Sequence, residues 1–157
     1  MTQKLPILTI PEPTLRQRSK EVDPKELEKP EFQAWLDDLV DTMYVADGVG
    51  IAAPQTGRTI RIFVAVDDKT PHILVNPVIR KKSFRRVDGE EGCLSVPGKY
   101  GIVSRHRSVR MDALDRHGKK ITFNVKGFFA RVLQHELDHL DGTLFIDRAK
   151  KVIDIAL

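Results

Sequence analysis

Two histidines four residues apart, His135 and His139, carry the clearest chemical signal in the chain, and Glu136 directly follows the first of them. On a helix, residues four apart stand one above the other, so both imidazoles can reach a single metal ion. Glu136 is offset round the same helix and can act on water beside the ion without binding the ion itself. Because a metal ion lowers the pKa of water and a carboxylate can take the proton, this spacing predicts a metal-dependent hydrolase.

A catalytic metal site usually has three protein ligands and one position open for water. Cys93, the single cysteine of the chain, is the candidate for the third ligand. A lone cysteine is more often an inert buried thiol, but the paired histidines favour a ligand here. One thiolate and two imidazoles suit iron(II), zinc, nickel or cobalt, and the ligand types do not choose among these metals.

The residues round the histidine pair predict the helix that must carry them. Apolar residues occupy more than one side of residues 128–140, which is typical of a central helix. The histidines are therefore expected inside the protein, where unpaired polar groups are costly, and not on a surface helix that carries them by chance. A second helix is expected over residues 31–46, where apolar residues recur at helical spacing, and a short one near residues 14–19.

The strand signals do not alternate with helices. Residues 60–66 and 73–75 read as strands joined by a turn at 67–71, and Pro77 limits how far the second run can continue in a sheet. Residues 109–114 and 120–125 predict a hairpin. Without a βαβ rhythm, the fold class expected is α+β, with antiparallel or mixed β-sheets packed around the central helix that carries the histidines.

Composition fits one catalytic domain over residues 1–157, with a short C-terminal tail after about residue 147. The net charge of +4 (26 Lys and Arg against 22 Asp and Glu) does not indicate a dedicated nucleic-acid binder. The basic runs at 80–82, 85–86 and 105–107 are expected to be solvated strand or loop residues. No apolar run reaches the roughly 18 residues of a membrane span, and the N-terminus resembles no targeting peptide, so we expect a cytoplasmic protein, or an organellar one if a targeting segment has been removed.

Three segments together resemble the signature motifs of the peptide deformylase family. They are GVGIAAPQ at residues 48–55, EGCLS at 91–95 and QHELDH at 134–139. They stand in the family's order with similar spacing, and the likeness extends from about residue 10 to residue 142. One HExxH motif alone is moderately specific, whereas the three together are very specific.

The resemblance implies a reaction and a role for each motif residue. The reaction is removal of the formyl group from an N-terminal formyl-methionine, with release of formate. Attack on the formyl carbon creates an oxyanion that needs preorganised donors. The implied roles are metal ligands for Cys93, His135 and His139, general base and acid for Glu136, and oxyanion donors for the Gln55 side chain and the Leu94 backbone N–H.

The substrate is expected to bind as an added strand. The resemblance implies that its backbone pairs near Gly50 and near Glu91 and Gly92, and that its methionine enters an apolar pocket formed with Val49 and Val132. Gly48 and Gly50 are expected to permit strained backbone angles and a close approach of the substrate. Glu91 and Ser95 are expected to hold the Cys93 loop, and Asp138 to order the site through an ion pair with Arg105.

The resemblance also implies the cofactor and partners. One divalent metal ion is expected, Fe²⁺ in the first place, with Zn²⁺, Ni²⁺ or Co²⁺ able to substitute. The partners expected are N-formyl-methionyl peptides and nascent chains, with a transient ribosome contact and no membrane, and the protein is expected to be a monomer.

Two other functions use part of the same residues. A metallopeptidase shares the His135–Glu136–His139 arrangement, but such enzymes commonly take a further His, Glu or Asp in place of Cys93. A structural metal module or an inactive binding protein needs neither a base nor an oxyanion donor, so Glu136 and Gln55 argue against it.

Overall fold

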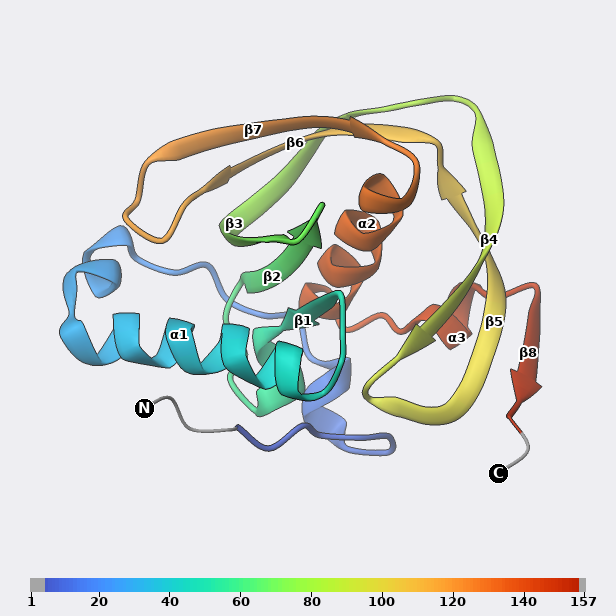
Figure 1. Cartoon of the computed structure of the whole chain (residues 1–157), viewed down its shortest axis with the longest axis horizontal. Coiled ribbons are helices and arrows are strands. Elements are labelled where there is room, and N and C mark those ends of the chain that lie inside the picture. The colour runs from blue at the N-terminus through green and yellow to red at the C-terminus, as the bar shows by residue number, and fades with distance from the viewer. Residues whose placement is uncertain (1–4, 156–157) are drawn as a thin grey trace.

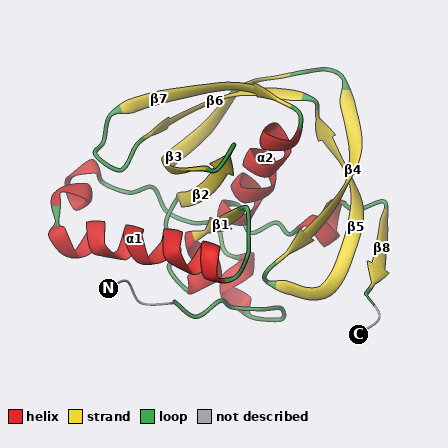
Figure 2. Ribbon diagram, in the orientation of Figure 1, coloured by secondary structure: helices red, strands yellow, loops and turns green. Residues whose placement is uncertain are grey.

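Helix α2 (Phe128–Leu140) lies between two antiparallel sheets in the computed structural model, which describes residues 5–155 (Figure 1). The larger sheet has the strand order β1-β2-β3-β6-β7, and the smaller has the order β4-β5-β8. Helix α1 (Pro30–Val45), one of the helices drawn in red in Figure 2, packs against β1 and β2 of the larger sheet. The α+β class, with sheets packed around the helix of the histidine pair, is confirmed.

The remaining elements are short. Three 3₁₀ helices span Pro13–Arg16, Pro24–Glu28 and Ala53–Thr56, and a one-turn helix, α3, spans Phe145–Arg148. The strands are β1 (Gly50–Ala52), β2 (Ile62–Asp67), β3 (Thr70–Lys82), β4 (Arg86–Cys93), β5 (Val96–His106), β6 (Ser108–Leu114), β7 (Lys120–Lys126) and β8 (Lys151–Asp154).

Strand β2 is buried on both of its faces, which explains its unbroken apolar run. Phe63 and Ala65 pack in the core that contains α2, whereas Ile62 and Val64 pack in the core that contains α1. Successive side chains of a strand point to opposite faces, so a strand between two helices needs apolar residues at every position. The two predicted helices thus bury the predicted strand from both sides.

Strand β3 is much longer than the predicted run at residues 73–75, and it continues through Pro77. The ladder to β6 has a register shift between Val75 and Val78, and Asn76 in this bulge has a positive φ of 51°. A bulge leaves a residue outside the hydrogen-bond ladder, so a proline there does not end the strand. The Asn76 amide also exchanges two hydrogen bonds with the Val22 backbone.

Strands β4 and β5 were not predicted as a pair, although they form the long ribbon of the smaller sheet. Most side chains of β4 are exposed and polar, so hydrophobic periodicity gives no signal there. Along β5, burial alternates through Gly101, Val103 and Arg105. The expectation that residues 105–107 are solvated is wrong for Arg105, which is only 4% exposed.

The two ends of the described chain differ from expectation in detail. The short helix predicted near residues 14–19 is a 3₁₀ turn that ends at Arg16, after which Ser19 N–H donates to the Leu140 carbonyl at the end of α2. The tail after residue 147 contains β8, which pairs with β5. Within residues 5–155, no helix is long and apolar enough to cross a membrane.

Candidate metal centre

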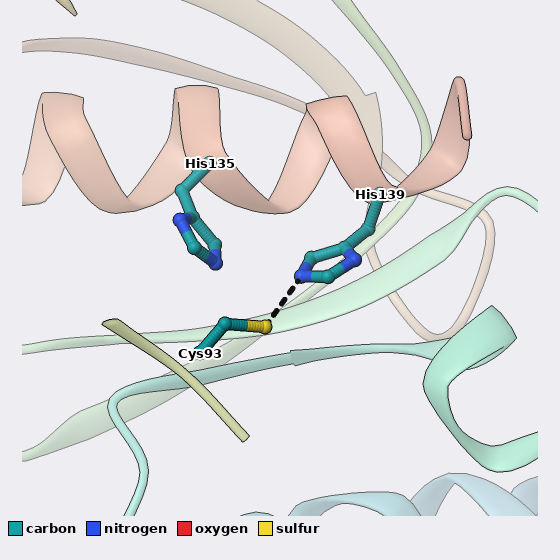
Figure 3. A group of neighbouring side chains, drawn as sticks. All are labelled: Cys93, His135 and His139. Atoms are coloured by element: carbon teal, nitrogen blue, oxygen red, sulfur yellow. Dashed lines mark hydrogen bonds between the residues drawn. The ribbon is translucent and has the colours of Figure 1, made fainter. Parts of the chain in front are cut away.

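Helix α2 presents His135 and His139 on one face, with ring centroids 5.1 Å apart. Cys93, the last residue of β4, lies opposite them, and all three side chains point toward one another (Figure 3). The Cys93 Sγ–His139 Nε2 distance is 3.3 Å, and the three ligand atoms lie within 4.8 Å of one another. Atoms bound to one tetrahedral metal at ordinary bond lengths are about 3.6 Å apart, so the three side chains fit a single ion.

The orientation of His135 is set by Glu91 on β4. His135 Nδ1 lies 2.9 Å from Glu91 Oε1. Burial of Glu91 opposes its ionisation, but the hydrogen bonds of Arg105 and His135 prevail and lower its pKa below the usual value. An ionised carboxylate only accepts hydrogen bonds, so Nδ1 is the donor and Nε2 is the nitrogen left to face a metal.

The site favours a positive charge between its ligands. Burial opposes protonation of His135, but hydrogen bonds with Cys93 and Glu91 raise its pKa to about 10. Burial, reinforced by the charges of His135 and Arg105, holds the pKa of His139 well below its ordinary value, so its imidazole is neutral. A bound cation would supply the positive charge that the proton on His135 supplies in its absence, and metal binding displaces such protons.

Glu136 lies beside the ligands and is 2% exposed, and its Oε2 has no hydrogen-bond partner among the described residues. Burial raises its pKa to about 7. The carboxylate faces Gly50, where a β-carbon would lie 2.9 Å from Oε2. The expectation of strained angles at Gly48 and Gly50 is wrong, because neither is among the described glycines with a positive φ, and Gly50 is needed for space.

Gln55 is buried and fixed at both ends of its amide. Its Oε1 accepts the Ala52 N–H at 2.9 Å, which leaves Nε2 as the end that faces the site. Nε2 lies 3.0 Å from Ser95 Oγ and 3.7 Å from Cys93 Sγ. Gln55 is therefore not a solvated loop residue, and an amide N–H donor stands next to the candidate ligand.

The ligands open onto a cleft of about 440 Å³ between the two sheets. Its lining contains the motif residues expected to act there, apart from the buried His139: Val49, Gly50, Gln55, Glu91, Gly92, Cys93, Leu94, Val132, His135 and Glu136. Phe128, 64% exposed, stands at its wall. The lining also includes Arg131, which sequence reasoning missed because a lone arginine on an apolar helix carries no motif.

A larger cleft of about 640 Å³ lies between α1 and the β6–β7 hairpin. Asp37, His72 and Arg116 are among its lining residues. Within residues 5–155, the group of side chains able to hold a metal ion is Cys93, His135 and His139. The candidate metal ligands therefore make the smaller cleft the candidate functional site.

Comparison with known proteins gives one consistent answer. The family model described as polypeptide deformylase matches residues 4–153. Peptide deformylase 1 of Vibrio vulnificus is 47% identical over 147 residues, which cover 91% of this chain and 84% of the relative. The peptide deformylase of Brucella suis is 42% identical over 152 residues, with 94% and 85% covered.

Solved structures agree with the sequence relatives. The crystal structure of peptide deformylase from Thermotoga maritima superposes with a TM-score of 0.90 at 34% identity, covering 95% of this chain and 99% of that one. The Met-Ala-Ser-bound class I type b peptide deformylase of Acinetobacter baumannii has a TM-score of 0.90 at 34% identity, with 94% and 99% covered.

Proposed function

The chain belongs to the peptide deformylase family, and from that premise we propose how its cleft removes the formyl group from an N-terminal formyl-methionine. The observation that carries the proposal is the convergence of Cys93, His135 and His139 beside the buried carboxylate of Glu136. These side chains come from β4 and α2, which are 35 or more residues apart in sequence (128 − 93 = 35).

We assign the three ligands to one divalent ion, Fe²⁺ in the first place, with Zn²⁺, Ni²⁺ or Co²⁺ as substitutes. A thiolate with two imidazoles suits these metals. Such an ion polarises the formyl carbonyl and lowers the pKa of water when it is bound. Glu91 supports the ligand set because its carboxylate accepts the hydrogen bond of His135 Nδ1 and so directs Nε2 at the site.

Glu136 is the general base and then the general acid. Its pKa, raised by burial to about 7, suits a group that takes and returns a proton near neutral pH. It takes a proton from the attacking water as the water oxygen bonds to the formyl carbon. When the carbon–nitrogen bond breaks, Glu136 returns the proton to the leaving amine, and formate and a free N-terminus are the products.

Gln55 and the Leu94 N–H are assigned to the oxyanion that forms on attack. Gln55 Nε2 is held on the Cys93 side of the cleft by the bond between its Oε1 and the Ala52 N–H. A donor that is already fixed needs no reorganisation as charge develops. Leu94 directly follows Cys93 and lines the same cleft.

The substrate backbone is assigned to the strand edges on both sides of the cleft. β1 and β4 are edge strands of their sheets, and Gly50, Glu91 and Gly92 line the space between them. An extended peptide can complete such an edge with main-chain hydrogen bonds. Val49 and Val132 form the apolar pocket for the methionine side chain, and the Met-Ala-Ser bound to the Acinetobacter baumannii enzyme also begins with methionine.

The proposed substrate determines the partners and the location that we assign. Formyl-methionine stands at the start of newly made chains, so we assign nascent polypeptides as the substrates, in the cytoplasm, with a transient ribosome contact. A monomer carries every residue of the assigned site, because all of them lie in one chain.

A hydrolysis assay with three substrates tests the proposed function. The protein is purified anaerobically, loaded with nickel or iron(II), and given formyl-Met-Ala-Ser, acetyl-Met-Ala-Ser or casein. Release of formate from the first substrate, without comparable hydrolysis of the others, is expected. Cleavage of casein would point to a metallopeptidase, and a metal-loaded protein inactive on all three would point to a binding role.

A further inference from the structure

The Arg131 guanidinium occupies the space that a side chain at residue 89 would take. A β-carbon built on Gly89 would lie 2.7 Å from Arg131 Cζ, 2.8 Å from Nη2 and 2.9 Å from Nε. Real β-carbons essentially never come so close to another heavy atom. Gly89 on β4 and Arg131 on α2 are therefore matched residues: the arginine can keep its place only if residue 89 is glycine.

Arg131 is fixed by three hydrogen bonds. Nη1 donates to Glu91 Oε2 at 2.7 Å and to the Val103 carbonyl at 2.9 Å, and Nη2 donates to the Val87 carbonyl at 2.7 Å. Its side chain is only 11% exposed. Gly89 pairs with Val103 across the β4–β5 ladder, so the guanidinium spans both strands at this pair.

The acceptor of the first bond connects Arg131 to the metal centre. Glu91 accepts from Arg131 and Arg105 and from His135 Nδ1. Without Arg131, Oε2 keeps Arg105 Nε as its donor, and the carboxylate that orients His135 loses one of its supports. β4, the strand assigned to the substrate, would also lose its attachment to α2 at Val87.

We propose that Arg131 is a positioning residue that fixes Glu91 and β4 on α2 together, and that Gly89 is the position that admits it. Through Glu91 it holds the Nε2 of His135 toward the metal. Through Val87 it holds β4, the strand on which the substrate pairs, while its bond to Val103 ties the same guanidinium to β5. The second of these roles rests on the proposed function, whereas the first does not. A planar fork suits this task, because one guanidinium can donate to several acceptors in fixed directions.

The experiment compares Arg131→Leu, Gly89→Ala and the double variant. Gly89→Ala is the informative change, because it keeps the arginine and its charge and displaces only the guanidinium. The first readout is the rate at which nickel-loaded protein loses metal to a chelator, measured without substrate. The second readout is KM, separated from kcat, for formyl-Met-Ala-Ser.

Each single variant is expected to lose metal about tenfold faster, as is usual for partners that support a metal ligand. Each is also expected to raise KM. The double variant is expected to be no worse than the worse single variant, because both changes disrupt the same contacts. Arg61→Leu is the matched control, since Arg61 is also buried but contacts the end of α2, and its metal loss should equal that of the wild type.

Wild-type metal loss in Gly89→Ala would overturn the proposal, as would single effects that multiply in the double variant. An equal acceleration in Arg61→Leu would also overturn it, because a general loss of stability would then explain the result. If Arg131→Leu fails to fold, Gly89→Ala alone decides. If the metal-loss pattern holds while the wild type releases no formate, the proposed function fails and the positioning of His135 stands.

Discussion

Arg105 Nη1 lies 2.6 Å from Asp138 Oδ2, and both side chains are buried between β5 and α2. The same guanidinium forms two hydrogen bonds with Glu91. The ion pair expected from the sequence is therefore confirmed, and Arg105 joins the carboxylate that orients His135 to the one that lies next to His139. Arg148 from α3 adds two further bonds to Asp138.

Replacing Arg105 by Met should strongly destabilise the protein. The change removes one arginine from each of the buried carboxylates Glu91 and Asp138, which keep Arg131 and Arg148, and breaking a buried pair costs up to about 3–5 kcal/mol. Denaturant unfolding of the metal-free protein measures the loss. Arg18→Ala is the control: its pair with Asp141 is exposed, so its loss should stay below about 1 kcal/mol. Equal losses in the two variants would contradict the importance of the buried network.

Cys93→Ala should fold but fail to retain its metal. The thiolate is one of three ligands, and the remaining imidazoles of His135 and His139 bind divalent ions more weakly. Metal content after dialysis, measured by elemental analysis, should fall well below one ion per chain. Circular dichroism serves as the control for folding. A full complement of tightly bound metal in this variant would remove Cys93 from the ligand set.

Gln55→Glu keeps the acceptor oxygen of the Gln55 side chain and removes its N–H donor. A carboxylate can still accept the Ala52 N–H, but it cannot donate to an oxyanion. Loss of one such donor typically costs about 10²–10³ in rate, so kcat should fall at least about 10²-fold while metal is retained. A kcat within threefold of the wild type would exclude Gln55 from transition-state stabilisation.

Asp147→Asn should weaken the protein in a pH-dependent way. Burial opposes ionisation of Asp147, but bonds from Arg16 and the Leu144 N–H lower its pKa below the usual value. A lowered folded pKa means that the carboxylate stabilises the wild type above the unfolded pKa of about 3.8 and loses this effect as pH falls through the folded value.

The size of that effect is limited by exposure, because the Asp147 side chain is 38% exposed. Wild type should therefore exceed Asp147→Asn by no more than about 1 kcal/mol at pH 7. The measurement is urea unfolding at several pH values, and the difference should shrink toward zero in acid. A difference that grows as the pH falls would have the wrong sign and would reject this linkage.

The sequence could predict elements in which apolar residues recur at one regular spacing. Residues 128–140 and 31–46 show the helical period, and the observed helices α2 and α1 agree with them within one residue at each end. The hairpin of β6 and β7 is predicted from a different signal, the turn residues between Asp115 and Gly118 that separate two strand-like runs. Strand β4 could not be found in this way, because its exposed edge carries polar residues and glycines whose partners lie in α2 and β5.

The residues of the site also differ in whether the sequence alone could predict them. His135, Glu136 and His139 are local on one helix, so their spacing alone indicates their geometry. Arg131 and Gly89 are 42 residues apart (131 − 89 = 42), and nothing in either neighbourhood signals that one makes room for the other. Such a match appears only when two elements pack, which is why the three-dimensional structure was needed to find it.

Glu136→Gln tests the central claim most directly, because it keeps the size and burial of the side chain and removes its ability to take a proton. Nickel-loaded wild type and variant are compared for bound metal per chain and for formate released from formyl-Met-Ala-Ser. The variant should bind as much metal as the wild type and release formate at least about 10²-fold more slowly, as expected for loss of a general base. Turnover within tenfold of the wild type at equal metal content would contradict the account.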